Sequence, residues 1–90
     1  MAADMGEDEL RQAARERLSR GELPRLSPER IWINRGEGDN CSLCGEIIPP
    51  SEREYELQFE MQFGLGRREL VSFRFHTRCH AIWQVERIRW

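Results

Sequence analysis

The sequence predicts a small α+β domain, and three observations carry that prediction. Residues 54–63 alternate polar and apolar side chains, which is the pattern of a β-strand with one buried face. Residues 77–89 carry apolar side chains at helical spacing. Cysteine and histidine residues stand in two closely spaced pairs, one before and one after the alternating stretch. A chain of 90 residues buries a modest core, so a metal ion that ties such pairs together would be a useful staple.

The alternating stretch predicts the first strand of an antiparallel hairpin. Its apolar face consists of Tyr55, Leu57, Phe59, Met61 and Phe63, and its polar face of Glu54, Glu56, Gln58, Glu60 and Gln62. Residues 64–68 contain two glycines and predict the turn. In the second strand we expect Val71, Phe73 and Phe75 to point inward and Ser72 and Arg74 outward. Arg74 can then meet the acidic face of the first strand.

Two helices are expected, one at each end of the chain. The C-terminal one, over 77–89, has the apolar stripe Ala81, Ile82, Val85 and Ile88 and should cover the hairpin. The N-terminal one, over 7–20, begins with acidic residues and ends with arginines, as the helix dipole favours. Its apolar stripe is thin, consisting of Leu10, Ala13, Ala14 and Leu18. We therefore expect a solvated appendage, with a docking helix for a partner as the alternative.

Between the first helix and the first cysteine the sequence predicts little regular structure. Residues 22–26 are interpreted as a linker, and 27–30 as a short capped turn with Ser27 as N-cap and Pro28 in first position. Residues 31–33 form an apolar knot, Ile-Trp-Ile, that we expect to pack on the body. These features divide the chain into an N-terminal helix and linker (1–30) and a zinc-binding domain (31–90).

The two pairs are Cys41 with Cys44, and His76 with Cys79. In each pair two residues separate the ligands, a spacing that lets both side chains of one turn bind the same ion. Two such pairs complete the tetrahedron of four ligands that zinc prefers. The alternatives are buried structural cysteines, a disulfide with one cysteine left over, and a redox Cys-x-x-Cys pair. The redox motif opens a helix after a strand, whereas a glycine and two prolines follow here. We predict one structural zinc ion and no catalytic residue.

The sequence leaves more than one candidate for the fourth ligand, because His80 follows Cys79 directly. His76 can be joined by Cys79 or by His80, and Cys79 with His80 is a third set. Neighbours on a helix point about 100° apart, which disfavours the third set. In the first turn of a helix, the helix dipole would also stabilise the thiolate of Cys79. We therefore predict His76 with Cys79.

A cysteine knuckle, a hairpin and a helix that begins with the second ligand pair resemble, in that order, the treble-clef class of zinc modules. The ligand order over 41–89 is also similar to the first half of a LIM domain. That resemblance implies one zinc ion on Cys41, Cys44, His76 and Cys79. The chain departs from LIM domains in the longer gap, residues 45–75, and in having no second ligand set.

Composition narrows the function classes. The formal net charge is −2, and every basic residue is an arginine. This balance disfavours a general nucleic-acid binder, although Arg67, Arg68, Arg74 and Arg78 could contact phosphates. No apolar run could span a bilayer, and the start has no signal-peptide core. We expect a cytoplasmic protein that binds another protein and is not an enzyme, with nucleic-acid-binding regulation as the alternative.

Overall fold

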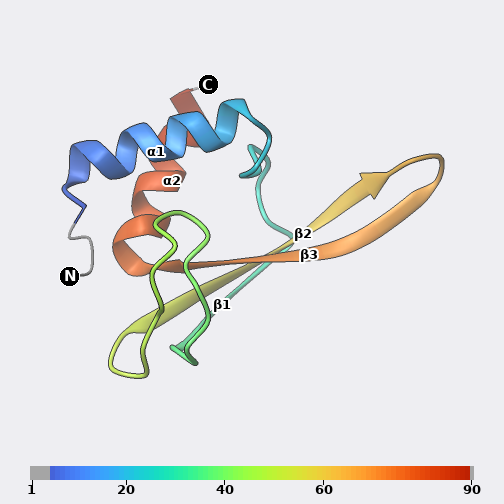
Figure 1. The fold of residues 1–90 in the computed structure, drawn as a ribbon. Helices are drawn as coiled ribbons and strands as arrows, with labels where there is room; N and C mark the ends of the chain where they lie inside the picture. Colours follow the sequence, from blue (N-terminus) through green and yellow to red (C-terminus); the bar gives the residue numbers. More distant parts are fainter. Residues whose placement is uncertain (1–4, 90) are drawn as a thin grey trace.

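The computed structural model describes residues 5–89 and consists of two helices and one antiparallel sheet. The elements are α1 (Glu7–Ser19), β1 (Arg30–Arg35), β2 (Arg53–Phe63), β3 (Arg67–His76) and α2 (Thr77–Arg89). The strand order in the sheet is β1-β2-β3. Figure 1 shows both helices on one side of the sheet, with the tip of the β2–β3 hairpin extending beyond them. The α+β prediction is confirmed.

The predicted hairpin forms, with Leu57 opposite Phe73 and Tyr55 opposite Phe75. Leu57, Phe59 and Phe75 are buried, and the facing residues near the tip are half-buried. On the other face Arg74 lies opposite Glu56, and their side chains pair at 3.4 Å, as predicted. The inward position expected for Phe63 lies outside the described side chains.

The apolar stripe predicted for the C-terminal helix was wrong, although the helix itself is confirmed. The buried residues of α2 are Cys79, Ile82, Trp83 and Glu86, whereas Val85 and Ile88 are exposed. These buried residues also have helical spacing, but they lie on a different face of the helix from the predicted stripe, the face that carries Cys79. Because Cys79 must face His76 from the first turn, it sets the rotation of the helix and brings Trp83 against Phe75, with ring centroids 5.6 Å apart.

The N-terminal helix is no appendage, which corrects the expectation from its thin stripe. Leu10, Ala14 and Leu18 are buried at no more than 1% exposure and join the main core. A narrow stripe suffices because α1 lies across α2 and packs on it (Figure 1). Polar contacts support the docking, since Arg15 Nε lies 3.0 Å from Glu86 Oε1. The predicted division of the chain into residues 1–30 and a zinc-binding domain of residues 31–90 stays a prediction.

Residues 27–35 differ from the sequence prediction in two ways. Residues 27–29 are not helical, and the N–H of Glu29 donates to the carbonyl of Gln58, which draws the chain into the sheet. Residues 31–33 then belong to β1, whose six residues are all exposed. The expected apolar knot does not pack inside the body, because these residues form an edge strand. No helix in the described part of the chain is long and apolar enough to cross a membrane.

Candidate metal centre

The first cysteine pair lies on a tight loop between β1 and β2. The N–H of Gly45 donates to the carbonyl of Cys41, and the N–H of Cys41 donates to the carbonyl of Glu46. Gly45 has φ of 82°, a conformation in which a side chain would be strained. The N–H of Leu43 also points at the Cys41 sulfur, at 3.4 Å. This loop, residues 41–46, therefore presents both sulfurs as a knuckle.

Ser42 anchors the knuckle to the outer edge of β3. Its N–H donates to the carbonyl of Arg74 at 2.6 Å, and its hydroxyl accepts from the N–H of Arg74 at 3.1 Å. Arg74 is two residues before His76, so these bonds fix the first ligand pair relative to the second. The sequence contained no signal for this role of Ser42, because it depends on which strand edge is nearby.

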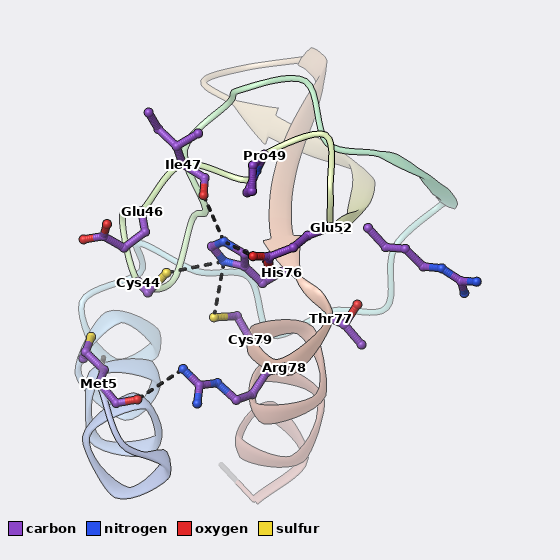
Figure 2. Close-up of a pocket in the computed structure, with 11 residues that line it drawn as sticks. Met5, Cys44, Glu46, Ile47, Pro49, Glu52, His76, Thr77, Arg78 and Cys79 are labelled. Atoms are coloured by element: carbon purple, nitrogen blue, oxygen red, sulfur yellow. Dashed lines mark hydrogen bonds and ion pairs between the residues drawn. The ribbon is translucent and has the colours of Figure 1, made fainter. Parts of the chain in front are cut away.

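The second pair lies where a strand passes directly into a helix. His76 is the last residue of β3, and Cys79 is in the first turn of α2. With no linker between the two elements, the imidazole and the thiol point into the same space (Figure 2). The structure thus brings together all four predicted ligands, and their donor atoms lie within 4.8 Å of one another.

The donor spacing fits one tetrahedral ion. The His76 Nδ1 atom lies 3.5 Å from the Cys44 sulfur and 3.9 Å from the Cys79 sulfur. In a regular tetrahedron with metal–sulfur and metal–nitrogen bonds of zinc length, that separation would be about 3.6 Å. The four side chains can therefore hold a single metal ion with small movements.

The orientation of the His76 ring is set from outside the cluster. Its Nε2 atom lies 3.1 Å from the carbonyl oxygen of Ile47. A carbonyl only accepts hydrogen bonds, so Nε2 carries the proton and Nδ1 keeps its lone pair for a metal. The Glu52 carboxylate is nearby, with Oε1 3.9 Å from Nε2. Figure 2 shows the ring held between the Ile47 carbonyl and the two sulfurs.

His80 lies apart from the cluster. Its ring stacks on Tyr55 with centroids 4.5 Å apart, and its Nε2 is buried without a hydrogen-bond partner in the described part of the chain. Burial, with a smaller effect of the Arg87 charge, lowers the pKa of His80. The geometry therefore favours His76 with Cys79 over the two alternative sets that include His80.

The three thiols share protons unequally in the metal-free chain. The pKa of Cys41 is lowered to about 4, chiefly because Cys79 donates a hydrogen bond to its sulfur. That same bond, together with burial, raises the pKa of Cys79. Burial raises the pKa of Cys44. If the folded form persisted without an ion, one thiolate and two thiols would therefore face the imidazole at neutral pH, and a metal ion that bound this folded form would displace the two remaining protons.

An open groove of about 530 Å³ leads to the cluster from the surface. Cys44, His76 and Cys79 line its floor, and Glu46 and Glu52 add carboxylates to its walls (Figure 2). The groove gives a cation a route to the cluster, and Arg53 and Arg78, which also line it, balance the charge of the two carboxylates.

The arginines considered for phosphate contact are engaged within the protein. Arg74 lies within 3.4 Å of carboxylate oxygens of Asp39, Glu54 and Glu56. Arg67 pairs with Glu69, and Arg68 with Glu60. Arg78 donates to the carbonyl of Met5. Each of these cations has its field reduced by a neighbouring acceptor, so they form no basic patch.

Comparison with known protein families, characterised proteins and solved structures finds no match for this chain.

Proposed function

We propose that this protein is a small zinc module in which Cys41, Cys44, His76 and Cys79 hold one structural ion, and that it binds another protein. The observation that supports it is the convergence of three thiols and an imidazole from a loop, a strand end and a helix start. Thiolate and imidazole are the donors that zinc prefers. Four protein ligands leave no open position for substrate, so the ion would serve folding rather than catalysis.

The treble-clef assignment belongs to the same proposal. A knuckle, a hairpin and a helix whose first turn carries a ligand follow one another in this chain, as they do in that class. The α1 helix and strand β1 are additions to that pattern. We place the protein in the cytoplasm, where thiols stay reduced and paired cysteines hold metal.

The surface supports a protein partner better than a nucleic acid. Ile31 and Ile33 are exposed on one face of β1, at 48% and 52%, and Trp32 is exposed on the opposite face, at 37%. Exposed apolar side chains that lie together mark interaction sites on small proteins, and the two isoleucines form such a pair. The arginines, by contrast, are paired with carboxylates, and the net charge is −2. We propose β1 as the interaction surface.

Elemental analysis of the purified protein tests the metal assignment. We expect one zinc ion per chain, and a cobalt-substituted sample with the absorption bands of a three-sulfur, one-nitrogen site. Cys79→Ser should change those bands, whereas the matched control His80→Phe should leave them unchanged. Iron in place of zinc, or less than about half an equivalent of any metal, would refute the proposal.

The interaction surface is tested by affinity capture with the zinc-loaded protein. Ile33→Ser should release the captured protein. Ile88→Ser, at an even more exposed isoleucine on α2, should not. Equal capture by both variants would remove β1 from the proposal.

A further inference from the structure

The three thiols of the cluster differ in how far they are open to solvent. Cys41 and Cys79 are buried, at 3% and 2% exposure, whereas Cys44 is half-buried. The two residues that follow Cys44 in the knuckle, Gly45 and Glu46, are exposed as well. Cys44 is therefore the cysteine of the cluster that a small molecule in the solvent reaches first.

The groove beside the cluster gives such a molecule access to Cys44. Cys44 and Cys79 line this groove together with the His76 imidazole, whereas Cys41 does not line it (Figure 2). Its volume of about 530 Å³ is many times the roughly 30 Å³ that a water molecule occupies in the liquid. A solute as small as hydrogen peroxide can therefore enter it and approach the Cys44 sulfur.

A second sulfur lies on the same turn as Cys44. Residues 42–44 form a turn, and the hydrogen bond from the N–H of Gly45 to the carbonyl of Cys41 closes it. The first and fourth Cα atoms of a turn lie within about 7 Å, and a disulfide spans Cα separations of about 4.4–6.8 Å. The sulfurs of the cluster already lie within 4.8 Å of one another. Cys41 and Cys44 can therefore form a disulfide within the knuckle, with no shift of β3 or α2.

We propose that Cys44 is an oxidation site, and that hydroperoxides convert the knuckle to a Cys41–Cys44 disulfide and so release the metal ion. This inference rests on the proposed function, because it concerns the thiolates that bind zinc. The thiolate is the nucleophilic form of cysteine, and every cysteine that binds zinc is a thiolate. Oxidation follows thiolate character and exposure. Among three thiolates, the half-buried Cys44 therefore reacts before the two buried ones.

The reaction balances with hydrogen peroxide as the oxidant. The Cys44 sulfur attacks one peroxide oxygen, the O–O bond breaks, and the products are a sulfenic acid at Cys44 and hydroxide. The Cys41 sulfur then attacks the sulfenic sulfur, the S–S bond forms, and a second hydroxide leaves. The two sulfurs lose two electrons to the peroxide, and two protons from solvent convert both hydroxides to water. Only His76 and Cys79 then remain as ligands, which is half of the set of four that structural zinc requires.

The test treats the full zinc-loaded chain with hydrogen peroxide in the presence of a zinc-sensitive dye. The dye should report release of the bound zinc, and peptide mass spectrometry after alkylation should find a Cys41–Cys44 disulfide and an alkylated Cys79. A brief exposure with a 1,3-dione, which traps sulfenic acids, should label Cys44 ahead of the other two cysteines. Reduction of the disulfide with zinc present should restore both the zinc content and the circular dichroism of the untreated protein.

Cys44→His and Cys79→His are a matched pair of variants, because each leaves two sulfurs and two imidazoles as zinc ligands. Cys44→His removes the half-buried thiolate and should slow the release of zinc by about tenfold or more. Cys79→His keeps both cysteines of the knuckle and should release zinc at close to the wild-type rate. The comparison uses variants that hold zinc before treatment. Where one does not, the order of labelling in the wild type decides.

Three results would overturn the inference. The first is a wild type that keeps its zinc in excess peroxide, which would leave the proposed function standing. The second is labelling that begins at Cys41 or Cys79, or a disulfide that includes Cys79. The third is a Cys44→His chain that releases zinc as fast as the wild type. A purified chain that holds no zinc, in contrast, refutes the proposed function whatever its response to peroxide.

Discussion

Removing the metal should unfold the protein and consume close to three protons per chain at pH 7. The ion would join the knuckle, the end of β3 and the start of α2. Its removal would therefore break the link among these three segments. Structural zinc contributes about 10–16 kcal/mol in small modules. That is comparable to the whole stability of a typical domain, about 5–15 kcal/mol. The metal-free chain should therefore lie mainly in the unfolded state.

The proton count follows from the thiols. In an unfolded chain the cysteine pKa is about 8.5, so at pH 7 Cys41, Cys44 and Cys79 all become protonated when zinc leaves. If the metal-free chain stayed folded, Cys41 would remain a thiolate with its pKa of about 4, and only Cys44 and Cys79 would take up protons. The count therefore distinguishes three protons for an unfolded chain from two for a preformed site.

The sign of the pH dependence follows as well. Protons compete with zinc for the sulfurs, so affinity falls as pH falls. With three protons exchanged, it changes by about a thousandfold per pH unit near neutrality. The assay is calorimetric zinc titration in buffers of different ionisation enthalpy, with circular dichroism of the metal-free sample. Two protons, together with a retained thermal transition after chelation, would refute the unfolding argument.

Further predictions concern the core and the second histidine. Phe75→Ala removes a side chain that is fully buried against α2 and should cost about 3–5 kcal/mol. Ile88→Ala, at 72% exposure, should stay within about 0.5 kcal/mol in the same chemical denaturation. Arg15→Ala strands the buried Glu86 carboxylate and should cost about 1.5–3 kcal/mol; Arg15→Met with Glu86→Leu should recover most of it. His80→Phe keeps a ring against Tyr55, removes the unpartnered Nε2, and should leave zinc affinity unchanged.

Elements with a strong local pattern could be predicted from the sequence. The hairpin over 53–76 and both helices follow from alternation, helical spacing and the charge at helix ends. Strand β1 could not be predicted in the same way, because its residues are all exposed and show no alternation of burial. It becomes a strand only because β2 offers it an edge.

The sequence by itself determined the candidate ligands, since two-residue spacing in each pair is a local property of the chain. It also determined which face of the hairpin is apolar, although Glu54, expected on the wet face, is buried at 2% as well. Only the tertiary structure decided which face of α2 is buried, that α1 docks on it, and that His80 stacks on Tyr55 instead of joining the cluster. The physical reason is that a helix can rotate about its axis at little local cost. The contacts that select one rotation, Cys79 toward His76 and Glu86 toward Arg15, connect residues far apart in the chain or in different elements.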